Sequence, residues 1–170
     1  MVAAGEFSVW CVYSVRGAAR LKLDENQMIT QSKVMPLLLD ACPGFQPVWQ
    51  EHLAWWKGEE PGAFNDAAEF ARYLVESYER GETHEFTAAF AAVEKTLIEG
   101  DEEARGLVTI GVIEALQTVA SHSCGAHVFI QWLGPTSRVA WAQIEKLWQG
   151  KRSLMDVIRS ERHHLERKIP

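Results

Sequence analysis

The segment from Asp101 to Ser121, DEEARGLVTIGVIEALQTVAS, is apolar on almost every side after Arg105. A helix without a polar face has to be covered by neighbours on several sides. Asp101 is a favourable N-cap residue, and the two glutamates after it complement the helix dipole. The segment therefore predicts a central helix inside a helical bundle. Gly106 and Gly111 each weaken such a helix by about 1 kcal/mol relative to alanine, so we expect a neighbouring helix to approach closely at both.

Helical patterns continue on both sides of this segment. Preceding helices are predicted to end near Ala41, near Lys57, at Gly81 and at Gly100. The predicted starting or capping residues of the other six helices are Thr30 or Ser32, Pro47, Asn65, Thr83, Thr136 or Ser137, and Ser153. The fold class expected is all-α: a single-domain bundle of about seven helices with short connections. Solenoid-like stacking of helix pairs is the alternative packing.

The chain of 170 residues divides into two parts. Residues 28–170 form the predicted helical domain, whose length suits one hydrophobic core. Residues 1–27 show no helical period. Their segment FSVWCVYSV is typical of a β-strand, but residues 1–27 are equally well read as an extension upstream of the native start. The segment lacks the features of a secretory signal, and no apolar run reaches the ~18 residues of a membrane helix. With three cysteines in no even, closely spaced set, we expect reduced thiols and a cytoplasmic protein.

Acidic residues are concentrated in the middle of the chain. Residues 50–105 contain 14 acids and 5 bases, whereas residues 106–170 contain 5 acids and 8 bases. An acidic surface repels nucleic acid and attracts a basic protein, whose approach it accelerates. Solvated helix faces give the same composition, so the charge alone leaves both interpretations open.

The segment HSCGAHVFIQWLGP places two histidines around a cysteine, at His122, Cys124 and His127. The spacing matches no standard zinc pattern, which has two separate ligand pairs. Gly125 suits the end of a helix, so a connection between two helices is the leading interpretation. A metal site, or a thiol activated by one of the histidines, is the alternative.

Glu114 is the most unusual carboxylate, because it interrupts the apolar run of the central segment. Burial would raise its pKa and suit it to acid–base catalysis. A structural pairing with an arginine or a tryptophan N–H is the other interpretation. The sequence contains no P-loop, no G-x-S-x-G and no H-E-x-x-H motif. We therefore expect no enzyme, no catalytic residues and no cofactor.

Two adjacent tryptophans, Trp55 and Trp56, cannot both face one core from the same helix. One of them is expected to be partly exposed, as an anchor for a partner, or to be covered by residues 1–27.

Four segments between about Pro47 and Gly150 carry a resemblance to a known group of proteins. They are VWQEHLAWW, FNDAAEFARYLVESYERGE, LIEGDEEARGLVTIGVIEALQ and LGPTSRVAWAQIEKLW. This part of the chain resembles a family of small all-helical bacterial proteins that look like immunity proteins of toxin systems, including type VI secretion effectors. The resemblance implies a protein that binds and neutralises one cognate toxin, often a nuclease.

The hypothesis from the sequence is therefore a cytoplasmic immunity-type protein whose partner is a toxin or effector. We expect it to bind neither nucleic acid nor a membrane, and a homodimer is a further possibility. A metal-binding or hydrolytic enzyme using Glu114 or the His122, Cys124 and His127 group is the first alternative, and a self-associating adaptor the second. The candidate partner contacts are Trp55, Trp56, Glu59, Glu60, Asp66, Glu69, Glu76, Asp101, Glu102 and Glu103.

Overall fold

A computed structural model describes residues 28–166 of the chain, with side chains for residues 28–150. The prediction for residues 1–27 lies outside the described residues. The described residues form helices and contain no strand, apart from one isolated bridge between Ile29 and Gly100. The expected all-α, single-domain bundle is confirmed. Its elements are α1 (Gln31–Ala41), η2 (Pro43–Phe45), α2 (Gln46–Trp55), α3 (Ala63–Glu79), α4 (Phe86–Glu99), α5 (Glu102–Gly106), η3 (Leu107–Glu114), α6 (Ala115–Ser121), η4 (Ala126–Trp132) and α7 (Pro135–Glu166).

The central helix is formed by α5, η3 and α6, which follow one another without a break. It contacts α1, α3, α4 and α7, so it is covered from several sides as its apolar sequence predicts. The middle part, η3, is a π-helix rather than the α-helix expected. An all-round apolar segment has no 3.6-residue stripe to keep in register, so the wider turn costs it little burial. Six of the eight residues of η3 are buried.

Only one of the two central glycines meets a neighbouring helix closely. A Cβ atom on Gly111 would lie 2.7 Å from the Cβ of Ala67 on α3, which confirms the expected close approach there. A Cβ on Gly106 would meet nothing within 4 Å, so the same expectation is wrong at that position.

Two helix boundaries follow the predicted caps closely. The Asp101 carboxylate accepts a hydrogen bond from the N–H of Ala104 at 2.7 Å and begins α5. Gly81 follows α3 with a φ of 76°, a left-handed conformation that glycine adopts at no steric cost. In both cases the cap needs only its own neighbours in the chain, which is why the local sequence predicts it.

Four predicted helix starts are wrong, and one of them is Thr136 or Ser137, since both residues lie inside α7, which begins at Pro135. Helix α3 begins at Ala63, and Asn65 is inside it, because the Asn65 amide donates to the Pro61 carbonyl instead of accepting from the helix. Helix α4 begins at Phe86, and the backbone carbonyl of Thr83, not its side chain, accepts the N–H of Phe86. Ser153 begins no helix, because α7 continues through Gly150 to Glu166. One glycine costs a helix about 1 kcal/mol, which does not end it without a cap or a proline nearby.

The start of α7 is fixed by a carboxylate from another helix. Glu94 of α4 accepts hydrogen bonds from the N–H of Thr136 at 2.7 Å and from the N–H of Ser137 at 2.8 Å. The Ser137 hydroxyl also donates to Glu94, at 2.7 Å. These contacts satisfy N–H groups that have no partner inside the helix. The first half of α7 then covers the core with Trp141 and Ile144.

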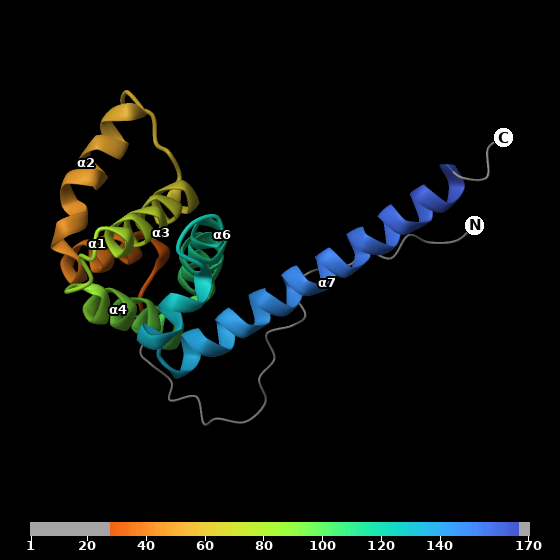
Figure 1. Cartoon of the computed structure of the whole chain (residues 1–170). Coiled ribbons are helices and arrows are strands. Elements are labelled where there is room, and N and C mark those ends of the chain that lie inside the picture. Colours follow the sequence, from red (N-terminus) through yellow and green to blue (C-terminus); the bar gives the residue numbers. More distant parts are fainter. Residues whose placement is uncertain (1–27, 167–170) are drawn as a thin grey trace, which may run out of the picture.

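Figure 1 shows how the elements are arranged. Helices α1, α3 and α4 lie together with α6, and α2 forms the outer edge on one side. The loop after α2 is at the top of this view, whereas α7 starts at the bottom and extends to the right, away from the other helices. Among the helices that the structure describes, none is long and apolar enough to cross a membrane.

Candidate binding surface

The His-Cys-His segment connects α6 to α7, as expected. His122 ends α6, Gly125 takes a positive φ of 86°, and the short helix η4 follows. Phe129 of η4 is fully buried, so the connection also contributes to the core. Within residues 28–150, no group of three or more His, Cys, Asp or Glu side chains converges to hold a metal ion. His122, Cys124 and His127 therefore do not form a ligand set in this arrangement.

Glu114 is half-buried at the end of η3. Among the described residues, its carboxylate has neither an ion pair nor a hydrogen bond, and no arginine or tryptophan N–H pairs with it as one interpretation expected. Its backbone carbonyl accepts the Thr118 hydroxyl at 2.9 Å.

Helix α2 carries a row of aromatic side chains on the face toward α3. The rings of Trp49 and His52 stack with centroids 5.7 Å apart, and His52 meets Trp56 edge to face at 6.3 Å. The spacing 49, 52 and 56 places the three side chains on one side of the helix. Phe45, in the short helix before α2, extends the row and is fully buried against Phe70 of α3.

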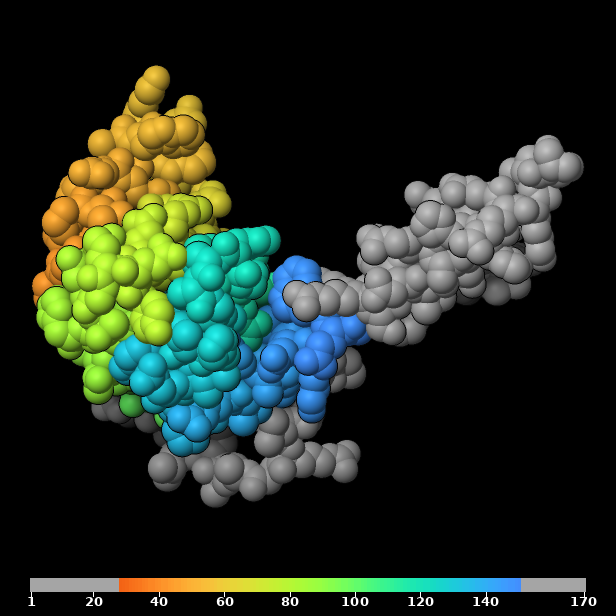
Figure 2. Space-filling view, in the orientation of Figure 1, coloured from red at the N-terminus to blue at the C-terminus, as the bar shows by residue number. Residues whose placement is uncertain are grey.

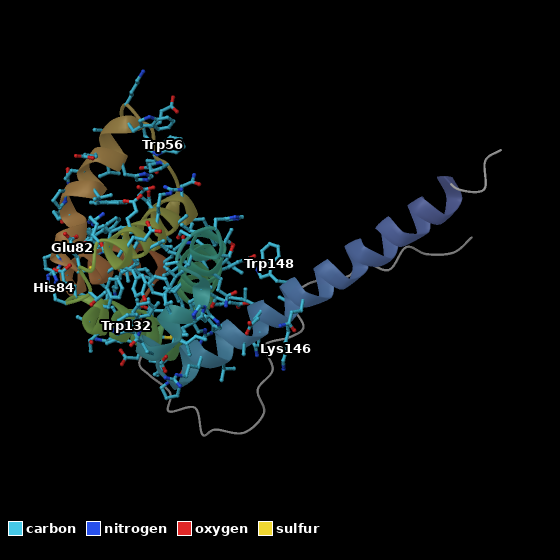
Figure 3. The ribbon with its side chains drawn as sticks, in the orientation of Figure 1. Trp56, Glu82, His84, Trp132, Lys146 and Trp148 are labelled. Atoms are coloured by element: carbon cyan, nitrogen blue, oxygen red, sulfur yellow. The ribbon has the colours of Figure 1, made fainter. Side chains whose placement is uncertain are left out.

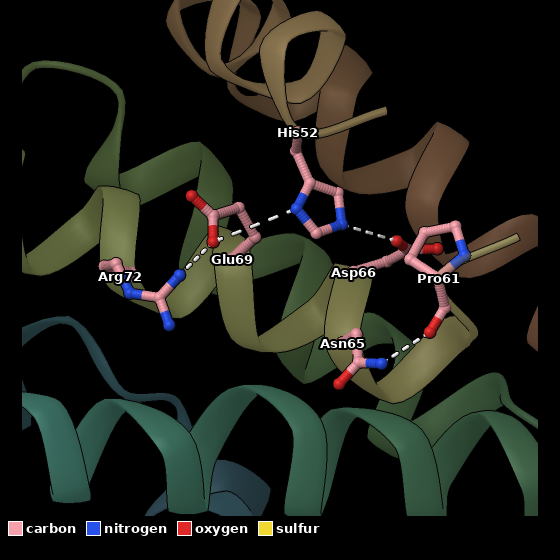
Figure 4. Close-up of polar contacts among 6 residues, drawn as sticks. All are labelled: His52, Pro61, Asn65, Asp66, Glu69 and Arg72. Atoms are coloured by element: carbon pink, nitrogen blue, oxygen red, sulfur yellow. Dashed lines mark hydrogen bonds and ion pairs between the residues drawn. The ribbon is translucent and has the colours of Figure 1, made fainter. Parts of the chain in front are cut away.

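Two of the predicted acidic contacts bind His52 instead of solvent. The Nε2 atom of His52 lies 2.9 Å from a carboxylate oxygen of Asp66, and Nδ1 lies 4.0 Å from Glu69 (Figure 4). Arg72 pairs with Glu69 from the other side. Asp66 and Glu69 are on α3, so these contacts join the two helices and hold α2 in place.

The two adjacent tryptophans differ in their exposure to solvent. Trp55 is 75% exposed, whereas Trp56 is half-buried and packs on His52. The two indole rings meet edge to face, with centroids 5.5 Å apart and an interplanar angle of 80°. Figure 3 shows Trp56 at the end of α2, far from Trp132 and Trp148. Trp55 is therefore the exposed anchor candidate, and Trp56 supports it.

The loop from residue 56 to residue 62 carries the exposed carboxylates of Glu59 and Glu60. Lys57, Gly58 and Gly62 all have positive φ, at 52°, 91° and 85°. A left-handed lysine is uncommon, since its Cβ crowds the backbone. The N–H of Glu59 donates to the carbonyl of Trp56 at 3.0 Å, which closes the first turn of the loop.

We call the end of this hairpin the α2–α3 tip and define it as Trp55, Trp56, Glu59 and Glu60, together with the supporting residue His52. The space-filling view in Figure 2 shows residues 46–62 as a projection from the body of the molecule. Residues 46–62 contain three acids and one base, Lys57. The tip is thus an exposed aromatic side chain on an acidic projection.

The other predicted contacts lie apart from the tip. Glu76 faces outward from α3 and lies 4.0 Å from Arg80, its predicted partner four residues away. Asp101 is committed to capping α5, and Glu102 and Glu103 are exposed in the first turn of that helix. No hydrogen bond, ion pair or ring contact within residues 28–150 joins these acids to the tip.

A second polar cluster was not expected from the sequence. Glu85, at the start of α4, accepts the Cys42 thiol at 3.1 Å and the N–H of Gly44 at 3.1 Å. Burial, followed by the hydrogen bond and the charge of Glu85, raises the pKa of Cys42 to about 12. Burial also raises the pKa of Tyr73, whose hydroxyl would lie 2.5 Å from a Cβ on Gly44. A protonated, buried thiol is a poor nucleophile, so this cluster joins η2 to α4 and has no evident chemistry.

His52 is the residue of the tip that sequence reasoning missed. Nothing in the local sequence indicates that acids from the next helix lie beside it. The histidine and the acids are 14 and 17 residues apart, so only the folded hairpin brings them together.

A comparison with protein families matches residues 35–149 to the family described as domain of unknown function (DUF7674). The match covers more than half of the chain, from α1 to the middle of α7, and includes the tip. The chain belongs to this family. No curated protein and no solved structure matches the chain significantly.

Proposed function

We propose that this DUF7674 domain is an immunity-type inhibitor that binds and neutralises a basic toxin or effector protein, such as a nuclease, through the α2–α3 tip. The observation that carries the proposal is the exposure of Trp55, 75% of whose surface is open to solvent on an acidic projection. The resemblance of residues 47–150 to immunity proteins supplies the class of partner. Binding, rather than catalysis, is the activity of the domain under this proposal.

An exposed tryptophan suits this role because of the energy that its burial releases. Interfaces are dominated by a few large anchors, and tryptophan is enriched among them. In solution, by contrast, an indole that touches water on most of its surface contributes little to folding. Trp55 is therefore better explained by a partner than by the stability of the domain.

The charge around the anchor suits a basic partner. Glu59 and Glu60 are exposed and follow the anchor in the loop by four and five residues, and the other acids of α2 and α3 add to the same negative field. Such fields raise association rates and fall with added salt. The fixed loop and the His52 contacts reduce the freedom that the tip would lose on binding, which favours affinity.

The test is partner capture followed by neutralisation. Tagged full-length chain is incubated with a nuclease-treated lysate of the organism that encodes it, and bound proteins are identified by mass spectrometry. We expect one stoichiometric partner with a toxin domain, whose toxicity in a heterologous host the chain suppresses. Trp55→Ala should abolish both capture and protection.

The matched control is Leu147→Ala. Leu147 of α7 is 63% exposed, so this variant also removes a large exposed apolar side chain, but on a different helix. The proposal fails if the two variants capture and protect equally well, or if the captured protein is not toxic.

A further inference from the structure

The tip combines two features: an exposed indole that meets Trp56 edge to face, and two exposed carboxylates that follow it in the chain by four and five residues. Asp66 and Glu69 already have partners in His52 and Arg72. Glu59 and Glu60 form no ion pair among the described residues and are exposed. The groups that remain available at the tip are therefore an aromatic face, the two carboxylates of the loop and the exposed ammonium of Lys57, which together leave the loop with a net negative charge.

From this combination we infer that the tip is a binding site for an arginine side chain of a protein partner, whose guanidinium lies on the indole of Trp55 while its charge faces Glu59 and Glu60. This inference rests on the proposed function and names the group that the partner presents. A cation over an aromatic ring is attracted most strongly by tryptophan. Nearby carboxylates add charge attraction that an isolated indole cannot supply.

Arginine fits the site better than lysine for physical reasons. The guanidinium is planar, stacks on aromatic rings and is weakly hydrated, so it loses less on leaving water than an ammonium group does. It also donates to carboxylates through a planar fork, while its face remains on the ring. The edge-to-face contact with Trp56 limits how Trp55 can turn, which leaves a stable surface for stacking.

The local geometry keeps the indole and the loop together. Trp55 is the last residue of α2, and the loop turns at once through Lys57 and Gly58, both in the left-handed region. The N–H of Lys57 donates to the carbonyl of Ala54 at 3.2 Å, so the turn is tied to the end of the helix. The carboxylates therefore begin only four residues after the ring, on a closed turn rather than on a separate element.

The probe for the test is acetyl-Arg-Gly-Arg-amide, compared with the corresponding lysine and glutamate peptides. Each is titrated into the ¹⁵N-labelled full chain and followed by NMR at the Trp55 indole N–H and the Gly58 amide. We expect the arginine peptide to shift both signals with millimolar affinity. The lysine peptide should bind about threefold more weakly, as the stacking difference predicts, and the glutamate peptide should not shift either signal.

Variants separate stacking from apolar contact and from net charge. Trp55→Leu keeps an apolar side chain but no π face, so it should weaken arginine-peptide binding about fivefold at the Gly58 amide. Glu59→Gln with Glu60→Gln should weaken it as well. The matched control, Glu102→Gln with Glu103→Gln, makes the same charge change at another exposed pair and should have no effect.

Three results would overturn the inference: equal affinity for the arginine and lysine peptides, no change in Trp55→Leu, or equal effects of the two glutamate pairs. The proposed inhibitor role is judged separately, by capture and protection. If the arginine peptide binds as expected and no toxin is neutralised, the arginine site stands and the inhibitor role fails. If neutralisation needs Trp55 but the arginine and lysine peptides bind equally well, the inhibitor role stands and the arginine site fails.

Discussion

Replacement of Glu94 by alanine should release the start of α7 from α4. The Glu94 carboxylate accepts the N–H groups of Thr136 and Ser137 and the Ser137 hydroxyl, at 2.7, 2.8 and 2.7 Å. It thus acts as an N-cap that comes from a different helix. Because α7 covers the core with Trp141, the loss should affect the unfolding of the whole domain.

The magnitude follows from these contacts. Loss of an N-capping side chain costs about 0.5–2 kcal/mol, and a hydrogen bond to a charged group contributes about 1.5–3 kcal/mol net. Glu94 is partly exposed, so we take the lower end of both ranges and expect Glu94→Ala to lower the free energy of unfolding by about 1–2 kcal/mol. Glu94→Gln keeps an acceptor oxygen and loses the charge at a helix N-terminus, which should cost about 1 kcal/mol.

Urea denaturation of the full chain, followed by circular dichroism, measures this loss. Glu79→Ala, at an exposed position of α3, is the control and should change stability by less than about 0.5 kcal/mol. Gly134→Ala should act through the same contact, because its Cβ would lie 2.5 Å from the Glu94 carboxyl carbon. The cost of Gly134→Ala should therefore shrink when Glu94 is already alanine. Full additivity of the two changes, or a loss below about 0.5 kcal/mol for Glu94→Ala, would refute the reasoning.

The same contact has a defined pH dependence. Burial raises the pKa of Glu94, but the hydrogen bonds from Ser137 and Thr136 outweigh it and hold the pKa below its usual range. A carboxyl with a lowered pKa in the folded state stabilises the fold above its unfolded pKa of about 4.3. That contribution is lost as the pH falls through the folded-state value. The stability difference between wild type and Glu94→Gln should therefore be largest near neutral pH and shrink below about pH 4; a difference that grows in acid would contradict this sign.

Three further outcomes follow from the same structure. Gly111→Ala should destabilise the domain by about 1–3 kcal/mol, because its Cβ would lie only 2.7 Å from the Ala67 Cβ. Gly106→Ala, whose Cβ would meet nothing within 4 Å, should stabilise the domain by up to about 1 kcal/mol. Chemical denaturation compares the two variants, and equal effects would contradict the packing. Cys42, with its pKa raised to about 12, should resist a thiol reagent at pH 8 in the native chain, while the half-buried Cys124 reacts. Peptide mass spectrometry measures both reactions, and comparable rates would contradict the burial of Cys42. Trp55→Ala should leave the thermal midpoint within about 2 °C of wild type, because the side chain is 75% exposed, and a larger fall in a calorimetric scan would assign Trp55 to stability instead of binding.

Much of the fold could be predicted because helix signals are local. The apolar run after Arg105 required a covered central helix, and Asp101 and Gly81 act within one turn of their own positions. The cap of α7 could not be predicted in this way. Thr136 and Ser137 were expected to cap the helix themselves, but the capping carboxylate comes from Glu94, more than 40 residues earlier. Such a contact depends on the packing of α4 against α7 and leaves no local pattern.

The candidate site was predictable only in part for the same reason. The pair of tryptophans predicted that one ring would be exposed or covered by residues 1–27, and Trp55 is 75% exposed. The sequence gives the number of acids in this region but does not show which of them are paired in the fold. Asp66 and Glu69 bind His52 and Arg72, whereas Glu59 and Glu60 remain exposed. Which acids remain available is decided by tertiary contacts, so composition overstates the size of the binding surface.

The most direct test of the account is partner capture with the tip altered and the rest of the fold intact. Wild type, Trp55→Ala and the Leu147→Ala control are used as baits at equal concentration, after circular dichroism has shown that all three are folded. We expect one basic toxin-type protein to be captured in stoichiometric amounts by wild type and by Leu147→Ala, and to be lost from Trp55→Ala. Equal recovery of that protein by all three baits would show that the α2–α3 tip is not its binding surface.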